Sequence, residues 1–320
     1  MLAEPIDGNF SISRDGLLMY HRATATAGRQ LTWFDRSGKT VGTVGEPATY
    51  GGVELSPSGD RAAVDITTAA NRDIWVMDLA RAIVSRTTFE DSAEWSAVWS
   101  PDGRQLAFAS QDQNSTRLYV KPASGVGARS LVASDEGSAI PITWLGDGQR
   151  IIFARPKGAT PGYDTWLQPV GGGRPSMFLE MPFDKLTVRV SPASRYVAYA
   201  SNESGQYQIF VQTFPDPAGG RWQITSEGGI EPKWRRDGKE LYYLGFDGKM
   251  MAVPVTGGAG FTTARPAALF QTPLTVNRAQ PNRERRYDVA PDGRFLMIAP
   301  TAAPAQTPYT IVVNWMAGLK

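Results

Sequence analysis

Four acidic residues stand at corresponding places in successive stretches of this chain, each at or near the start of a short apolar segment. They are Glu54, Glu94, Asp184 and Glu231. If these segments converge, the carboxylate oxygens can together ligate a hard cation such as Ca²⁺ or Mg²⁺. Alternatively, each carboxylate is a solvated loop end or is paired with Lys185 or Arg285. The residue types leave an oxygen-ligated divalent cation open as an alternative.

Other kinds of catalytic chemistry are restricted by the rare residue types. The 320-residue chain has one histidine, His21, and no cysteine. A Ser–His–Asp triad would have to use His21, and the chain contains no G-x-S-x-G motif. One imidazole and no thiol cannot build a zinc site from the usual His and Cys ligands. We expect His21 to have no catalytic role, and we expect no enzyme activity and no resident cofactor.

The charge balance and the hydropathy pattern exclude two further classes. Basic residues number 33 against 31 acidic residues, for a formal net charge of +2. A nucleic-acid-binding domain usually has a dominant basic face, so we expect no nucleic-acid partner. No apolar run approaches the roughly 18 residues of a membrane span, and the start MLAEPIDGNF lacks a signal-peptide pattern. We expect a soluble monomer that does not insert into a membrane.

A four-residue turn recurs along the whole sequence. Its versions are SRDG (13–16), SPSG (56–59), SPDG (100–103), LGDG (145–148), SPAS (191–194), RRDG (235–238) and APDG (290–293), with successive spacings of 43, 44, 45, 46, 44 and 55 residues. Proline presets the first corner, aspartate bonds to nearby backbone, and glycine accepts positive φ where the next strand departs. This is the chemistry of a β-hairpin.

Each turn is flanked by short strand-like segments. AVW (97–99) precedes one turn and LAFA (106–109) follows it, and most units continue with a third and a weaker fourth segment. Four antiparallel strands per repeat, with sheets that bury their faces against their neighbours, are typical of a β-propeller. We predict an all-β chain that forms a single propeller domain over residues 1–320. A β-sandwich would not keep this spacing.

We predict seven blades, with six as the alternative. The expected blades cover residues 8–47, 50–90, 94–134, 138–180, 185–226, 229–272 and 285–316. The last of these has only three strand-like segments, so we expect residues 1–6 to pair with it as its outer strand. Such closure ties the chain ends together and removes an exposed sheet edge. The alternative has six complete blades and a packed C-terminal hairpin.

A propeller of this kind has two faces, and the loops opposite the repeated turns are the longer and more variable ones. Loops on a rigid scaffold commonly carry binding sites, and aromatic side chains there favour contact with a partner. The candidate contact residues on this face are Tyr50, Trp95, Tyr163, Tyr207 and Arg286, the last of them in the basic run NRERR (282–286). That run is otherwise a solvated loop. Glu54, Glu94, Asp184 and Glu231 are the candidates for the mouth of the central channel.

Several stretches carry a resemblance to a known family. They are QLTWFDRSGKTVGTVGEP (30–47), NRDIWVMDLAR (71–81), LYVKPASG (118–125), WRRDGKELYYL (234–244), RYDVAPDGRFL (286–296) and TIVVNWMAGLK (310–320). Their order resembles the TolB-like, WD-type β-propeller, and more narrowly the propeller at the C-terminal end of many bacterial serine/threonine protein kinases. The resemblance covers essentially the whole chain. It implies an extracytoplasmic sensor or interaction domain, in the periplasm or at the cell surface.

The kinase itself is absent from this sequence. GVGARS (125–130) lacks the third glycine of a phosphate-binding loop, and FDG (246–248) is typical of a hairpin turn. We therefore predict a non-catalytic module, the sensor or scaffold part of a bacterial signalling protein. It would bind a protein, a peptide or a small ligand on its loop-rich face. The alternative is an enzyme or a small-ligand-binding propeller with an oxygen-ligated divalent cation in its channel.

Overall fold

The computed structural model describes residues 10–12, 17–20, 28–111, 115–133, 137–157, 162–179, 183–257, 260–277, 285–301 and 310–313. In these ranges the regular structure is β-strand, apart from one 3-10 helix, Pro217–Gly219. None of the described residues belongs to a helix long and apolar enough to cross a bilayer. The chain divides into two compact units, residues 30–299 and residues 1–29 with 300–320.

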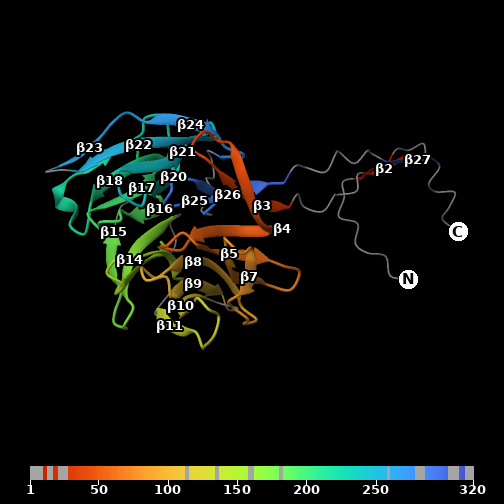
Figure 1. The fold of residues 1–320 in the computed structure, drawn as a ribbon, viewed down its shortest axis with the longest axis horizontal. Helices are drawn as coiled ribbons and strands as arrows, with labels where there is room; N and C mark the ends of the chain where they lie inside the picture. The colour runs from red at the N-terminus through yellow and green to blue at the C-terminus, as the bar shows by residue number, and fades with distance from the viewer. Residues whose placement is uncertain are drawn as a thin grey trace. The chain divides into compact units, whose positions relative to one another are not determined.

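The larger unit contains four-stranded antiparallel sheets that follow one another along the chain (Figure 1). Blade 1 comprises the end of β4 (Thr40–Leu55), then β5 (Arg61–Thr67), β6 (Arg72–Asp78) and β7 (Ile83–Arg86). Blade 2 comprises β8 (Ala93–Trp99), β9 (Gln105–Gln111), β10 (Thr116–Pro122) and β11 (Ser130–Ala133). Blade 3 comprises β12 (Ile140–Trp144), β13 (Arg150–Pro156), β14 (Tyr163–Pro169) and β15 (Ser176–Leu179).

Two further sheets complete this series. Blade 4 comprises β16 (Lys185–Val190), β17 (Tyr196–Ser201), β18 (Gln208–Thr213) and β19 (Arg221–Gln223). Blade 5 comprises β20 (Ile230–Trp234), β21 (Glu240–Leu244), β22 (Lys249–Gly257) and β24 (Ala267–Gln271). The end of β22 also pairs with β23 (Phe261–Thr263), which extends the blade as a short hairpin.

The remaining sheet of this unit is built from segments far apart in the sequence. β25 (Tyr287–Val289) pairs with β26 (Phe295–Pro300), β26 neighbours β3 (Arg29–Phe34), and β3 neighbours β4. Figure 1 shows the blue β26 beside the red-orange β3. We call β25, β26, β3 and the first part of β4 the closing blade. The second part of β4 pairs with β5 from Thr49 onward, so one 16-residue strand joins the closing blade to blade 1.

This pairing corrects the predicted composition of the last blade. The third strand expected there is β27 (Thr310–Val313), but it pairs with β2 (Leu17–Tyr20), and β2 pairs with β1 (Phe10–Ile12) in a three-stranded sheet of the smaller unit. The proposed closing segment, residues 1–6, lies outside the described residues. The strand beside β26 is β3 instead, which was assigned to the first predicted blade. The described strands of residues 30–299 form three sheets of four strands, one of five and one of seven, the last of which contains both the closing blade and blade 1 with β4 in common. The number of blades, predicted as seven with six as the alternative, stays a prediction.

The repeated turn forms wherever its residues are described. In all six such turns the fourth residue donates its backbone N–H to the carbonyl of the first, at 2.8–3.0 Å. The fourth residue has positive φ in each, from +68° to +86° at the glycines 59, 103, 148, 238 and 293, and +52° at Ser194. The conformation that favours glycine therefore recurs even where serine replaces it. The seventh copy, residues 13–16, lies outside the described residues.

Neighbouring blades bury each other's apolar faces. Ile74 of blade 1 packs in one cluster with Leu106 and Phe108 of blade 2, and all three side chains are fully buried. Tyr199 of blade 4 is likewise buried in a cluster with Ile152 of blade 3. A sheet with two apolar faces is stable only between such neighbours, which is why the strands after the turns are apolar on both faces.

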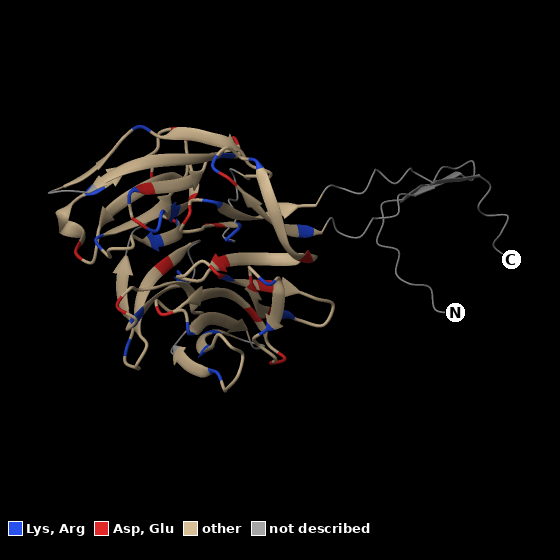
Figure 2. Ribbon diagram, viewed as in Figure 1, with Lys and Arg blue, Asp and Glu red and all other residues tan. Residues whose placement is uncertain are grey.

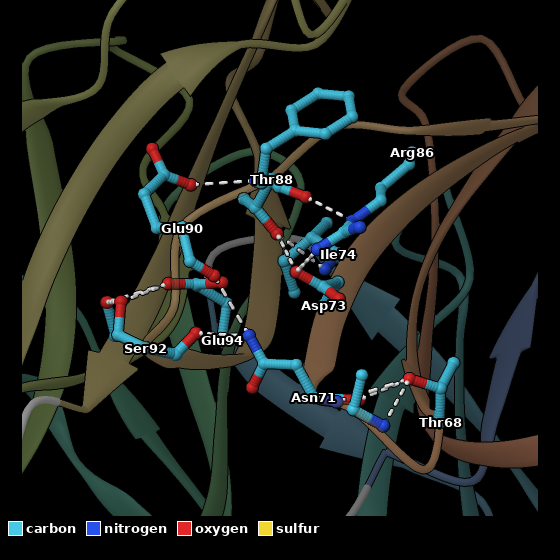
Figure 3. A network of polar contacts seen from close by, with 12 residues as sticks. Thr68, Asn71, Asp73, Ile74, Arg86, Thr88, Glu90, Ser92 and Glu94 are labelled. Atoms are coloured by element: carbon cyan, nitrogen blue, oxygen red, sulfur yellow. Dashed lines mark hydrogen bonds and ion pairs between the residues drawn. The ribbon is translucent and has the colours of Figure 1, made fainter.

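A threonine–backbone hydrogen bond recurs at the outer part of two blades. Ile74 N–H donates to Thr88 Oγ1 at 2.9 Å (Figure 3), and Ile209 N–H donates to Thr225 Oγ1 at 2.9 Å. Both threonines are buried. Each hydroxyl thus satisfies a strand N–H at the point where the weak fourth strand ends.

We expect Thr88→Val and Thr225→Val each to lower the free energy of unfolding by about 1–3 kcal/mol, because each leaves a buried N–H without its acceptor. Urea denaturation followed by tryptophan fluorescence measures this change. Thr262→Val is the control, since Thr262 is exposed and bonds only to Thr256 O. Equal losses in all three variants would show that the shared motif has no special energetic role.

Candidate functional site

A cavity of about 380 Å³ lies where the first strands of blades 1 to 4 come together. It is lined by residues 51–54 at the end of β4, by β5 and β13, by the middle of β8, by the first parts of β12 and β16, by the starts of β6 and β14, and by Arg285. The starts of β6, β12, β14 and β16 are the ends of these strands away from the repeated turns, which is the side predicted to bind. That the cavity forms the mouth of the central channel stays a prediction.

The first strands reach this cavity through irregularities in their pairing. The register shifts in β4, β8, β12, β16 and β20, each time near the middle of the strand. In three of them a non-glycine residue takes positive φ, namely Ser96, Thr187 and Glu231 at +57°, +48° and +53°. Such bulges bend a strand and redirect its side chains. In β4 the irregularity falls at Gly51, where the reason for glycine is space: a Cβ there would overlap the Asp65 carboxylate and the Arg72 guanidinium.

One position of the repeat forms the charged centre of the unit. The residue two places before each turn is Glu54, Val98, Thr143, Arg189, Lys233 or Asp288. Lys233 Nζ lies 3.3 Å from Glu54 Oε2 and 3.1 Å from Asp288 Oδ1. Arg189 Nη2 lies 3.9 Å from Glu54 Oε2. Four blades thus contribute to a single ion-pair cluster, and Figure 2 shows basic and acidic segments near the middle of this unit.

Arg285 adds a third cation to Glu54 from the segment that leads into β25. Its Nη1 lies 3.7 Å from Glu54 Oε2. Burial alone would raise the pKa of Glu54, but the positive charges of Lys233, Arg285 and Arg189 outweigh it and lower that pKa to about 2. Burial lowers the pKa of Arg285 to about 10. Glu54 is therefore ionised at neutral pH and is held by three cations.

Arg285 also reaches across to the opposite blades. Its guanidinium donates to Ala97 O at 2.5 Å, to Pro141 O at 2.7 Å and to Ile142 O at 3.1 Å. Ala97 is in β8 and the other two are in β12, so one side chain ties the closing segment to blades 2 and 3. The floor of the cavity is thereby held rigidly.

Two of the predicted contact aromatics line this cavity together with Glu54. Trp95 lies at the bulge of β8 and Tyr163 begins β14, and both are half-buried. The Arg72 guanidinium lies 5.8 Å from the centre of the Trp95 ring and pairs with Asp65. Residues assigned from sequence to the face and to the channel mouth thus share one site.

The other predicted residues lie elsewhere. Tyr207 donates its hydroxyl to Asp184 Oδ2 at 2.6 Å, and neither residue lines the cavity. Tyr50 is 1% exposed and donates its hydroxyl to Glu46 O at 2.7 Å, so its ring belongs to the core of blade 1 and cannot contact a partner. Arg286 is also buried, against the prediction of an exposed basic run, because its guanidinium pairs with Glu231.

Glu94 is the centre of a separate buried network within blade 2 and the segment that leads into it, part of which is drawn in Figure 3. Its Oε1 accepts from Ser92 Oγ at 2.6 Å, from Ser110 Oγ at 2.9 Å and from Arg129 Nη1 at 3.2 Å. Burial raises the pKa of Glu94, although these hydrogen bonds oppose the shift. Glu94 thus links the start of β8 to β9 and to the segment before β11, and it does not line the cavity.

The four predicted carboxylates therefore do not converge. Glu54 pairs with cations, Glu94 with Ser92, Ser110 and Arg129, Asp184 with Tyr207, and Glu231 with Arg286. Among the described residues no group of three or more His, Cys, Asp or Glu side chains is arranged to hold a metal ion. The arrangement instead presents guanidinium and ammonium groups beside two aromatic rings.

Sequence reasoning missed the basic residues Arg189 and Lys233. The signal was present, because a charged residue stands two places before the turn within an otherwise apolar strand in four of the repeats. A charge at an inward-facing strand position requires a buried partner. Aligning the repeats on that position would have placed Glu54, Arg189, Lys233 and Asp288 together.

Comparison with known proteins agrees with this architecture. No protein-family model matches the sequence. The structure of a TolB protein from Agrobacterium tumefaciens has a TM-score of 0.67 at 15% identity, over 87% of this chain and 100% of that chain. An oligogalacturonate lyase in complex with manganese has a TM-score of 0.55 at 14% identity, over 93% of this chain and 97% of that chain.

A chain from a nidogen/laminin complex has a TM-score of 0.54 at 10% identity, over 71% of this chain and 89% of that chain. Likeness at such identities concerns the fold and not the activity. The antiparallel sheets, the repeated turns and these structural matches together establish that this chain is an all-β propeller with a TolB-like fold.

Proposed function

We propose that this protein is a non-catalytic binding module that takes its ligand at the mouth of the channel. The observation that carries the proposal is the 380 Å³ cavity lined by Trp95, Tyr163 and several charged groups. Pockets of about 300–1,000 Å³ with apolar walls and a few fixed polar groups are typical of small-molecule sites. A small ligand, or one side chain of a protein partner, fits this volume.

The rigidity of the site supports binding rather than turnover. Arg285 is held by three carbonyls and by Glu54, and the cavity has no apposed pair of unengaged carboxylates among its lining residues. General acid–base catalysis needs groups free to exchange protons near neutral pH. Glu54, with a pKa of about 2, is a permanent anion and does not meet that need.

The module is proposed to be the extracytoplasmic sensor or scaffold part of a bacterial signalling protein. The support for this role is the resemblance of the stretches quoted above to propellers of bacterial kinases, together with the TolB-like fold. A second candidate is a propeller with a divalent cation in its channel. The manganese-bound oligogalacturonate lyase motivates it, but the carboxylates of this chain point to separate partners.

A thermal-shift screen of the intact chain tests the binding proposal. The probes are amino acids, sugars, organic acids, nucleotides, and Mn²⁺ and Ca²⁺ alone. We expect at least one organic probe to raise the Tm, and we expect Trp95→Ala and Tyr163→Ala each to weaken its binding about tenfold, or 1.4 kcal/mol. Phe89→Ala is the control, because Phe89 is exposed and does not line the cavity.

Two outcomes would contradict the proposal. In the first, a probe binds equally well to the wild type and to both cavity variants, which would place binding elsewhere. In the second, only the metal ions raise the Tm, which would favour the cation-dependent alternative.

A further inference from the structure

The charges that line the cavity are unbalanced. Its basic residues are Arg72, Lys185, Arg189 and Arg285, and its acidic residues are Glu54 and Asp65. Arg72 and Asp65 form a close pair, and Glu54 lies beside both Arg189 and Arg285. Lys233 and Asp288 beside Glu54 add one charge of each sign and do not change the balance. Among the described lining residues, two buried guanidinium groups therefore share one carboxylate, and a further anion would stabilise them.

Arg189 has unused hydrogen-bonding capacity at the cavity. The residue is 7% exposed, and its Nη1 donates to Val188 O at 2.9 Å and to Ile142 O at 3.2 Å. Its Nη2 lies 3.9 Å from Glu54 Oε2, beyond hydrogen-bonding distance. Its buried Nε has no hydrogen-bond partner in the described part of the chain. The Nε–Nη2 edge is the side of a guanidinium that binds a carboxylate or phosphate in bidentate fashion.

The backbone beside Arg189 points to the same place. Thr187 lines the cavity with φ of +48°, and its Oγ1 also has no hydrogen-bond partner within the described ranges. Ser96, across the cavity in β8, has φ of +57°. β-Branched threonine rarely takes this conformation, and strained residues of this kind are concentrated at binding sites.

The rest of the wall is apolar. Trp95, Tyr163, Ile140, Pro141 and Ala154 line it, beside the charged groups. An inorganic ion would use the charges and leave these surfaces without a partner. A ligand that combines one anionic group with an apolar body would use both.

We propose that the cavity binds a small organic anion, with its carboxylate or phosphoryl group at the Nε–Nη2 edge of Arg189 and its apolar body against Trp95 and Tyr163. This inference rests on the proposed function, because it names the ligand class of the same site. Glu54 is the resident anion of the site and competes with the ligand for Arg189 and Arg285. Because of that competition, removing the Glu54 carboxylate should strengthen the binding of an anion.

The experiment compares probes that share a body and differ in charge. Phenylacetate, phenyl phosphate and the neutral phenylacetamide are titrated into the intact wild-type chain, and tryptophan fluorescence and Tm are recorded. We expect the two anions to bind at least tenfold more tightly than the amide. The tighter of the two anions identifies carboxylate or phosphate as the preferred group.

Two variants make the test specific to this site. Arg189→Gln should weaken anion binding at least tenfold while amide binding stays unchanged. Glu54→Gln should strengthen anion binding, because the competing carboxylate is removed, and the anions should raise the Tm of this variant more than that of the wild type. Arg294→Gln is the control, because Arg294 lies at a repeated turn on the other face.

The inference would be overturned if the amide and the anions bind equally well, or if the folded Glu54→Gln variant binds the anions more weakly than the wild type does. Either result would leave the proposed binding module in place. The absence of binding by either anion would overturn it as well. If, in addition, no probe of the wider screen responds to Trp95→Ala or Tyr163→Ala, the proposed function itself fails.

Discussion

Arg286→Ala is expected to lower the free energy of unfolding by about 3–5 kcal/mol, because it leaves a buried carboxylate without its cation. Glu231 is 3% exposed, and Arg286 donates to it through Nε at 2.7 Å and through the backbone N–H at 3.2 Å. A second guanidinium nitrogen of Arg286 also contacts Glu231 Oε1. Glu231 lies in the first strand of blade 5, and Arg286 directly precedes β25 of the closing blade. Loss of the pair therefore weakens the contact between these two blades. Urea denaturation at pH 7 measures the effect.

The pH dependence of this variant gives an independent check. Burial raises the pKa of Glu231 above its usual 4.5 in spite of Arg286. Without Arg286 the opposing attraction is gone and the folded-state pKa rises further. A carboxyl group whose pKa is higher in the folded than in the unfolded state destabilises the protein above that pKa, and lowering the pH relieves the destabilisation. The stability difference between the variant and the wild type should therefore shrink from pH 7 to pH 5.

Two further variants control for the loss of a side chain as such. Arg150→Ala removes an exposed guanidinium that lies 2.7 Å from Asp147 Oδ2, and exposed pairs contribute about 0–1 kcal/mol. The double variant Glu231→Gln, Arg286→Met removes both charges and should recover much of the loss. If Arg150→Ala and Arg286→Ala lose the same stability, or if the double variant is no better than the single one, then the buried pair does not have the assigned role.

The sequence predicted the repeating elements because their determinants are local. A turn of four residues depends on the conformations of those residues alone, and the six described copies have the predicted hydrogen bond and positive φ. The same holds for the apolar strand after each turn. Its side chains are apolar at successive positions, and this pattern indicates burial of both faces of the strand between neighbouring sheets.

The closure of the larger unit was not predictable in this way. β26 has an open edge that any extended segment can fill, and both residues 1–6 and β3 are extended segments by sequence. β3 fills it because Phe34 and Phe295 then both contact Phe270 of blade 5, at 6.2 and 5.5 Å between ring centres. That preference depends on contact between Phe34 and side chains more than 200 positions later in the sequence, which periodicity cannot reveal.

Part of the site was predictable, because it depends on the repeating strands. The topology of a propeller brings its first strands together around one axis, which places Glu54 and Trp95 near each other, and the start of β14 adds Tyr163. Tyr50 and Arg286 stand at the places in the repeat where contact residues were predicted, but their side chains turn inward to Glu46 and Glu231. Which way a side chain turns at a bulged strand depends on its partners and not on its place in the repeat.

Phe295→Ala in the closing blade is expected to cost about 3–5 kcal/mol, the usual range for a buried phenylalanine truncated in a core. Phe295 is 0% exposed, and its ring centre lies 5.1 Å from that of Tyr242 and 5.5 Å from that of Phe270, both edge-on. Tyr287 packs beside it at 6.5 Å. The ring therefore fills the space between blade 5 and the closing blade. The segments around Phe295 belong to packed sheets, so they cannot move to fill the space that the removed ring would leave.

The matched control is Phe89→Ala, which removes the same atoms from a side chain that is 60% exposed. Two cations of the described chain lie at the ring face of Phe89, Arg86 at 5.2 Å and Lys121 at 5.5 Å, so we expect a loss of about 0.5–1 kcal/mol. Because Phe295 lies in β26, which pairs with β3, its truncation should also increase hydrogen exchange in β3 and β26 more than in β9 and β10. Uniform exchange across all four strands would mean that the ring opens as a whole and that the closing blade is not its weakest point.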